Sequence, residues 1–404
     1  MKTKLLFTFS ILMVLALQAS SKGIRISSVF DLQRIGNDVD YPLDGHYELT
    51  QDIDLANINF NSIGHNSIVQ FSGIFDGRGH TIRGLYIARI GHNSQGLFRV
   101  LESGGEIKNL GLVDVDVTAS YYVGSLVGIL RGGTITNCYS TGSISGTNSI
   151  GNVGGLVGRM TSGTIIGSYT NVNLDGVNRV GGLVGEMFGG KIENSYSVVD
   201  LLHVGGFLSS RTSPYGGLIG SVTMGEIVNC YSTVISIRNI MGDGITGGLI
   251  GASELATVTN SYWDTETSGL TTSAGGEGRT TAQMNRQATF IGWDFDDIWQ
   301  IDEGTGYPYL SALAHTSVID NRITRNTAIK PAPLITVKGK TLNIKALPNS
   351  DLQIKLFDMR GKTLARFNTR GSNSFSLAKI PAGRYLVETR ENGKRVGTTA
   401  VVLN

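Results

Sequence analysis

Two carboxylates at alternating positions are the residues of this chain best placed for acid–base chemistry. Asp114 and Asp116 alternate with three valines in the run VDVDV at 113–117. Alternate residues of a strand point to the same face, so the two carboxylates would project outward about 7 Å apart. Enzymes that cleave polysaccharides use carboxylates grouped at such distances. The pair therefore supports one hypothesis, a carbohydrate-active enzyme (a polysaccharide lyase or glycoside hydrolase) with Asp114 and Asp116 as its catalytic residues.

The surrounding sequence favours a second interpretation, in which the two carboxylates are solvent-facing positions of a strand. The outward positions of the following repeats hold scattered polar residues rather than a cluster of acids, namely Ser143, Ser145, Asn173, Asp175 and Asp200. No column of Arg or Lys accompanies them to stabilise an anionic transition state. His80 lies in the turn GRGHTI, where a structural hydrogen bond is expected, and the other five histidines lack metal-ligand spacing. The sequence predicts no metal and no cofactor.

Aromatic residues near the end of the repeats form another candidate site. All three tryptophans of the chain, Trp263, Trp293 and Trp299, lie there, and Tyr307 follows them. Their rings could form a platform against which sugar rings stack. The same residues are also expected in a cap, because an open stack of repeats ends in unpaired strand edges and an exposed core. We predict a cap over residues 264–315, with sugar binding by Trp263, Trp293, Trp299 and Tyr307 as an additional role.

A repeated motif must position these residues. Two glycines and two aliphatic residues recur as VGSLVG at 123–128, VGGLVG at 153–158 and 180–185, YGGLIG at 215–220 and TGGLIG at 246–251. Thirteen residues after each first glycine comes a second signal: NCYS at 137, GSYT at 167, NSYS at 194, NCYS at 229 and NSYW at 260. Short alternating segments between Gly, Asn and Ser turns, about 30 residues per unit, predict seven rungs of a right-handed parallel β-helix.

The repeat also predicts what each column of residues does. The Leu and Val of GGLVG should fill the coil, and the glycines should occupy corners where a Cβ would clash. The asparagines should form a ladder of amides, and the tyrosines at 139, 169, 196, 231 and 262 should stack. Cys138 and Cys230 would lie three rungs apart, about 14 Å. That separation is too long for a disulfide, so both thiols should be free.

Composition divides the rest of the chain into further segments. Lys2 and Lys4 precede the apolar run 5–17, which is too short to span a bilayer and is typical of a secretory signal peptide over 1–21. Residues 22–95 should hold an N-terminal cap and the first rungs, 96–263 the repeats, and 316–332 a linker. Seven short strands with turn signals predict a β-sandwich over 333–404. From Lys330 onward the chain carries 14 Lys and Arg against 4 Asp and Glu, a charge step that supports a separate unit.

Two stretches carry resemblances to known families. FSGIFDGRGHTIRGLYI, the serial VGGLVG…GTITNCYSTGSISG units and the closing NSYWDTETSGLTTSAGGEGRTTAQM resemble secreted bacterial proteins with GLUG-motif repeats, over residues 24–310. This resemblance implies an adhesin-like or cell-surface β-helix and little about chemistry. IKLFDMRGKTL…LAKIPAGRYLVET resembles the C-terminal sorting domain of type IX secretion substrates, although the chain ends in Asn404 rather than a basic residue. That resemblance implies the secretion machinery as a partner, and a secreted or outer-surface location in a Gram-negative bacterium.

Together these features predict an all-β protein with a parallel β-helix followed by a small β-sandwich. Its expected function is an adhesin or binding surface for a polysaccharide or cell-surface glycan, and the alternative is the carbohydrate-active enzyme. No nucleic-acid partner is expected, because the basic residues of the tail are spread through alternating strands rather than clustered. No transmembrane segment is expected after the signal peptide.

Overall fold

The computed structural model describes most of the chain in two separate compact units, Met1–Ser317 and Val318–Asn404. The predicted signal peptide (1–21) and nearly all of the predicted linker (316–332) lie outside the described residues. These are 23–56, 58–65, 68–148, 151–204, 213–239, 245–316, 334–338, 340–345, 351–358, 362–391 and 394–403.

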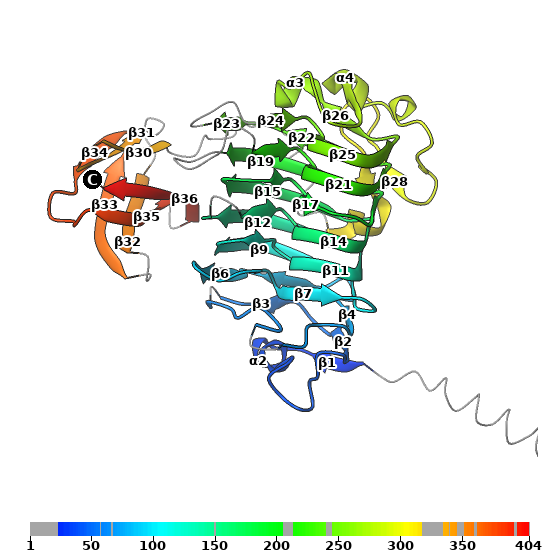
Figure 1. Ribbon diagram of the computed structural model, residues 1–404, viewed down its shortest axis with the longest axis horizontal. Helices are drawn as coiled ribbons and strands as arrows, with labels where there is room; N and C mark the ends of the chain where they lie inside the picture. The colour runs from blue at the N-terminus through cyan, green and yellow to red at the C-terminus, as the bar shows by residue number, and fades with distance from the viewer. Residues whose placement is uncertain are drawn as a thin grey trace, which may run out of the picture. The chain divides into compact units, whose positions relative to one another are not determined.

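The first unit is a parallel β-solenoid of about 6 turns, which confirms the predicted fold class. Successive turns stack strand upon strand, from β2 near the start to β25 and β26 near the end (Figure 1). One face is an 11-stranded sheet, sheet A, made of β1 (Ile24–Ile26), β2 (His46–Leu49), β4 (Ile74–Asp76), β7 (Phe98–Glu102), β8 (Glu106–Lys108), β11 (Val127–Thr136), β14 (Val157–Ile166), β17 (Val184–Met187), β18 (Lys191–Glu193), β21 (Ile219–Val228) and β25 (Ile250–Thr259).

Two further parallel sheets form the other faces, sheet B along most of the solenoid and sheet C from β10 onward. Sheet B, also 11-stranded, contains β3 (Ile53–Asp54), β5 (Thr81–Arg83), β6 (Tyr86–Arg89), β9 (Gly111–Ala119), β12 (Tyr139–Gly146), β15 (Tyr169–Gly176), β19 (Tyr196–Val204), β22 (Tyr231–Val234), β23 (Ile237–Asn239), β26 (Tyr262–Asp264) and β27 (Glu277–Arg279). Sheet C is 5-stranded and contains β10 (Tyr122–Val123), β13 (Asn152–Gly154), β16 (Val180–Gly181), β20 (Pro214–Gly216) and β24 (Ile245–Gly247).

Strand register confirms the repeat alignment made from the sequence. In sheet C, Gly154, Gly181, Gly216 and Gly247 are successive partners. In sheet B, Tyr139, Tyr169, Tyr196, Tyr231 and Tyr262 are successive partners. Both signals of the repeat therefore form straight columns along the solenoid.

The motif glycines lie where two backbones meet. A Cβ on Gly154 would lie 1.9 Å from the carbonyl oxygen of Val157, and one on Gly155 would lie 2.0 Å from that of Gly182 in the next turn. Such contacts leave no room for a side chain, because real Cβ atoms do not approach backbone so closely. The aliphatic residues of the motif point inward and are fully buried, namely Leu126, Leu156, Leu183, Leu218, Leu249, Val127, Val157, Val184, Ile219 and Ile250.

The asparagine column follows from backbone geometry. Asn109, Asn137, Asn194, Asn229 and Asn260 all have φ between 46° and 52°, a left-handed conformation that asparagine tolerates better than most residues. The predicted amide ladder is confirmed between Asn137 and Asn109 (3.4 Å) and between Asn229 and Asn194 (3.3 Å). It is interrupted at Gly167, which takes the asparagine position in one turn.

The tyrosine column stacks as expected from Tyr139 to Tyr231. Ring centroids are 5.1 Å apart between Tyr139 and Tyr169, and 4.8 Å apart for both Tyr169–Tyr196 and Tyr196–Tyr231, with interplanar angles of 5°, 2° and 6°. The distance between ring centres is close to the distance between neighbouring strands, because equivalent residues on paired strands lie directly above one another.

The two cysteines are buried and free, as predicted. Burial raises the pKa of both the Cys138 and the Cys230 thiol to about 12. Because the thiolate is the reactive form, neither cysteine should react with iodoacetamide at pH 8 in the native protein, and both should react after unfolding. Mass spectrometry would count the labels. Rapid labelling of the native protein, or a mass lower by two hydrogens, would contradict the buried, unpaired arrangement.

Short elements close both ends of the solenoid. At the N-terminal end, α2 (Val29–Arg34) is capped by Ser28, whose hydroxyl accepts from the Asp31 N–H. At the other end lie α3 (Thr265–Ser268), α4 (Thr281–Met284), η1 (Gln287–Thr289), the two-stranded pair β28 (Trp299–Gln300) and β29 (Tyr309–Leu310), and η2 (Ser311–Thr316).

The second unit contains two antiparallel sheets around one core. The first sheet holds β30 (Leu334–Lys338), β31 (Thr341–Lys345) and β34 (Asn373–Ser376), and the second holds β32 (Asp351–Asp358), β33 (Thr363–Arg370), β35 (Gly383–Glu391) and β36 (Lys394–Leu403). Leu342 from the first sheet and Leu356 and Val387 from the second are fully buried in the same cluster. These seven strands are consistent with the predicted sandwich.

Within the described ranges, the chain forms no helix long and apolar enough to cross a bilayer.

Candidate functional site

A cavity of about 380 Å³ lies beside the first ring of the tyrosine column. Its walls are formed by strands of sheets A and B, by the loops that connect these strands, and by η2 of the C-terminal cap. The lining residues are Asp76, Arg78, Gly79, Asn109, Leu110, Gly111, Tyr139, Ala312 and Leu313. This volume is in the range of small-molecule sites, which are concave and combine apolar walls with a few polar groups. The lining supplies a carboxylate, a guanidinium, an amide and a phenol ring.

The cavity exists because the tyrosine column stops there. One turn before Tyr139 the partner position is Gly111, and the residue one turn earlier is Thr81. A Cβ on Gly111 would lie 2.4 Å from the Tyr139 ring, so the ring lies directly over this glycine. Tyr139 is only 2% exposed, and it therefore forms the floor of the cavity rather than an open platform.

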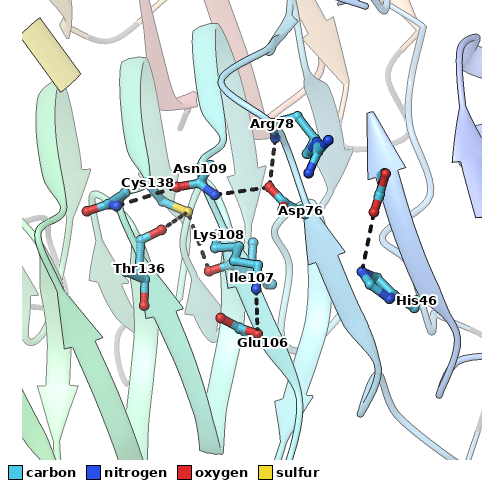
Figure 2. A network of polar contacts seen from close by, with 11 residues as sticks. His46, Asp76, Arg78, Glu106, Ile107, Lys108, Asn109, Thr136 and Cys138 are labelled. Carbon is cyan, nitrogen blue, oxygen red and sulfur yellow. Dashed lines mark hydrogen bonds and ion pairs between the residues drawn. The ribbon is translucent and has the colours of Figure 1, made fainter. Parts of the chain in front are cut away.

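Asp76 is the charged group held most firmly in the lining. Its side chain is largely buried, and its Oδ1 accepts from the Arg78 N–H (2.8 Å) and from Asn109 Nδ2 (3.1 Å). Figure 2 shows Asn109 between Asp76 and the amide of the next turn. Because Asn109 Oδ1 accepts from Asn137, its amide nitrogen must face Asp76. The ladder thus fixes both groups before any ligand arrives.

A clamped turn places Arg78 at the rim. Arg78 has a left-handed backbone with φ of 54° and stands between two glycines. The N–H of Gly77 donates to the Lys108 carbonyl (2.8 Å) and that of Gly79 to the Asn109 carbonyl (2.9 Å), so the turn is tied to the next rung. A Cβ on Gly79 would meet no atom within 4 Å. The Arg78 side chain is exposed and can donate toward a ligand at the rim.

The chemistry of this lining suits binding better than bond cleavage. Hydrolysis of a glycosidic bond ordinarily requires a pair of carboxyl groups on opposite sides of the bond, and the cavity lining contains one, Asp76. Only Oδ1 of Asp76 has hydrogen-bond partners among the described residues. Its Oδ2 remains an acceptor for a ligand hydroxyl.

The predicted carboxylate pair lies outside this cavity. Asp114 is exposed and forms an ion pair with Arg83 at 2.8 Å. Its φ of 55° marks a bulge, where pairing between β9 and β12 shifts after Leu112–Ser140 and resumes at Val115–Gly142. The expected strict alternation is therefore interrupted at Asp114, while Asp116 is half-buried opposite Ser143. A catalytic role for Asp114 and Asp116 stays a prediction.

The predicted aromatic site is packed inside the cap. Trp299 is 0%, Trp263 6% and Trp293 8% exposed. Each indole N–H already donates to the protein: Trp263 to the Leu270 carbonyl, Trp293 to the Asn260 carbonyl and Trp299 to Asn194 Oδ1. The half-buried Tyr307 donates to Asp264 Oδ2 at 2.6 Å. Sugar stacking on these rings would require the cap to open, and it stays a prediction.

The turn that borders the cavity was visible in the sequence, but through His80 rather than through the residues that line the cavity. The turn GRGHTI drew attention to His80, whose Nδ1 lies 3.3 Å from Asp52 Oδ1 in the structural role expected of it. The cavity is lined instead by the neighbouring Asp76 and Arg78. The repeat alignment places Asp76 beside the head of the asparagine column, where an acid replaces the next amide of the ladder.

Fold and site together define a solenoid repeat protein with a small polar cavity. The model of the GLUG motif matches residues 119–145, so the chain carries a GLUG motif, as the resemblance implied. The other repeats lie in register with the matched one.

Two curated proteins are similar in sequence to part of this chain. Halomucin of Haloquadratum walsbyi is 34% identical over 137 residues, 31% of this chain and 2% of that protein. A proposed Gly-rich membrane protein of Evansella cellulosilytica is 40% identical over 68 residues, 16% of this chain and 8% of that protein. The chain thus spans a small fraction of either relative.

A solved structure shares the fold. The crystal structure of a proposed immunoglobulin A1 protease from Bacteroides ovatus superposes with a TM-score of 0.57, covering 73% of this chain and 94% of that one at 21% sequence identity. At this identity the similarity supports the solenoid architecture and carries no activity across.

Proposed function

We propose that this chain is an exported binding protein, and that its solenoid binds a saccharide in the cavity between Asp76, Arg78 and Tyr139. The observation that carries the proposal is the preorganised lining: a buried carboxylate fixed by two hydrogen bonds beside an exposed guanidinium and a tyrosine floor. Vicinal sugar hydroxyls can donate to Asp76 Oδ2 and accept from Arg78, while Tyr139 and Leu313 contact the C–H face of the ring.

Export and surface display form the second part of this proposal. The charged and apolar segments of residues 1–21 support secretion, and the C-terminal sandwich resembles a sorting domain that engages the type IX secretion machinery. A secreted or outer-surface location in a Gram-negative bacterium follows, with an adhesin role toward a polysaccharide or cell-surface glycan. The regular column structure of the solenoid suits a rigid scaffold that presents one site.

The test is retention of the mature chain on a panel of plant, bacterial and host glycans, with release of reducing ends scored in the same samples. Retention without release is expected. Failure to retain any glycan would overturn the saccharide proposal. Release of sugar ends that vanishes in Asp114→Asn or Asp116→Asn would establish the enzyme instead.

The Asp76→Asn variant tests the cavity itself. An asparagine can keep the Oδ1 bonds to Arg78 and Asn109 while replacing the cavity-facing acceptor by a donor. Loss of one hydrogen bond to a charged group should weaken binding about tenfold or more, measured by calorimetry with the retained glycan. Asp54→Asn is the matched control, because exposed Asp54 makes the same kind of turn contact, to the Ala56 N–H, away from the cavity. Equal affinity of both variants would place the site elsewhere.

A further inference from the structure

A second polar cluster lies where sheets A and C meet, and it shares no residue with the cavity lining. It consists of Tyr122 (β10), Asn152 (β13), Arg159 (β14), Arg179 just before β16, and Glu186 (β17). Tyr122 and Asn152 are partners on adjacent strands, as are Arg159 and Glu186. The repeat therefore stacks these residues in two neighbouring columns.

Two guanidinium groups share one carboxylate in this cluster. Arg179 Nε lies 3.0 Å from Glu186 Oε1, and Arg159 Nε lies 3.4 Å from Glu186 Oε2. The Glu186 side chain is only 11% exposed, whereas those of Arg159 and Arg179 are 26% and 37% exposed. Two positive charges against one negative charge leave a net positive cluster whose outer parts are the arginines.

Arg159 is held in a fixed plane. Its guanidinium carbon lies 4.3 Å from the centre of the Phe188 ring and 5.1 Å from that of Tyr122, and one of its terminal nitrogens donates to the Tyr122 hydroxyl at 2.9 Å. Such stacking restricts the side chain and presents the donors of its planar fork in one orientation.

Arg179 occupies a backbone conformation that a residue of its type rarely adopts. Its φ is 39°, in the left-handed region that costs free energy for residues other than Gly and is best tolerated by Asn. A residue chosen for backbone geometry alone would be Gly or Asn. An arginine at this position indicates that its side chain has a role, of which the ion pair with Glu186 is one part.

Two atoms inside the cluster lack hydrogen-bond partners. Asn152 is 1% exposed; its Nδ2 donates to Glu186 Oε2 at 2.6 Å, and its buried Oδ1 has no partner. The buried Nε of Arg159 likewise makes no hydrogen bond. Arg159 Nε still has its ion pair with Glu186 Oε2 at 3.4 Å. Because buried polar atoms are normally satisfied, the Asn152 oxygen is the atom that calls for an additional donor.

We propose that Arg159 and Arg179 bind the carboxylate of an acidic sugar residue such as a uronate, with a ring hydroxyl donating to Asn152 Oδ1 after a small side-chain adjustment. Planar guanidinium groups match carboxylates in shape and charge. This site is separate from the Asp76 cavity and depends on the proposed function only for the ligand being a saccharide.

The test compares tri-galacturonate with its fully methyl-esterified form, which removes the carboxylate charge and little else. Binding of each to the mature chain is followed by calorimetry, with tri-glutamate as the acidic-peptide probe. We expect binding of tri-galacturonate and at least about tenfold weaker binding of the ester. Equal binding of ester and acid, or no binding of the acid, would overturn the proposal. Preference for tri-glutamate would replace the sugar by an acidic peptide and contradict the ligand class.

Arg179→Asn separates ligand binding from stability. The change removes a donor fork, and relief of the left-handed backbone offsets part of the lost ion pair with Glu186. Affinity for tri-galacturonate should therefore fall about tenfold or more with little change in melting temperature. Arg131→Gln is the control, an arginine of the same solenoid, 52% exposed and paired with Glu102, which should leave affinity within about twofold. A lower melting temperature with unchanged affinity would show a purely structural ion pair. Asp76→Asn should keep this binding, which distinguishes failure of the cavity proposal from failure of this one.

Discussion

Replacing Gly181 by alanine should destabilise the solenoid by about 3 kcal/mol or more. A Cβ at this position would lie 2.0 Å from the Val184 carbonyl oxygen and 2.5 Å from the Gly220 nitrogen. Both are backbone atoms, one in the same turn and one in the next, so no side chain can rotate away to make room. Relief requires two strands of sheet C and sheet A to separate, which breaks the stack at its centre. Urea denaturation followed by circular dichroism would measure the loss.

The matched control is Gly189→Ala, in the same turn of the solenoid. A Cβ on Gly189 would be 3.5 Å from the Thr161 carbonyl oxygen and 3.6 Å from Met224 Cγ, both ordinary contacts. Alanine restricts the unfolded chain more than glycine, so this variant should be neutral or up to about 1 kcal/mol more stable. If Gly181→Ala and Gly189→Ala unfolded at the same urea concentration, the close approach at the motif would not limit the residue type.

The repeat architecture could be predicted because each of its signals is local. A glycine pair, two inward aliphatic residues and an asparagine at a left-handed position recur within a short stretch of each repeat, so each signal can be seen in the sequence of one repeat. The constant offset of 13 residues between the two signals then forces both into columns once the turns stack. The tyrosine stack and the free cysteines could be predicted for the same reason. The distance between two residues of one column is the number of turns between them multiplied by the known rise per turn.

The two polar sites could not be predicted in this way because their residues come from positions where repeats differ. Arg179 and Glu186 lie in one turn and Arg159 in the turn before it, and the corresponding positions elsewhere hold Pro214, Ser221 or Ala252. Nothing local distinguishes these substitutions from ordinary surface variation. The cavity beside Tyr139 depends on Leu313, more than 170 residues further along the chain. The bulge at Asp114 also could not be predicted, because it depends on how β9 pairs with β12 and the alternation of Val and Asp in the sequence contains no information about that pairing.

Replacing Trp299 by alanine should cost about 3–5 kcal/mol of stability, the range for removing a large buried aromatic side chain. Trp299 is fully buried. Its ring centre lies 4.3 Å from that of Trp293 in the cap and 6.0 and 6.2 Å from those of Tyr196 and Tyr231 in the solenoid. The indole therefore joins the cap to the tyrosine column, and its loss leaves a cavity against both. Urea denaturation and limited proteolysis of residues 264–315 would measure the two effects.

The proteolysis pattern of this variant also distinguishes the two roles predicted for the aromatic cluster. If the cluster is a cap, Trp299→Ala should lower the unfolding midpoint and speed cleavage within residues 264–315 together, because the cap and the tyrosine column are packed against each other through Trp299. Ile291→Ala, at a cap residue that is 69% exposed, should change stability by less than about 0.5 kcal/mol. If Trp299→Ala instead lost glycan retention while keeping its unfolding midpoint, the cap would have to open in the native state. The tryptophans, rather than the Asp76 cavity, would then be the sugar-binding site.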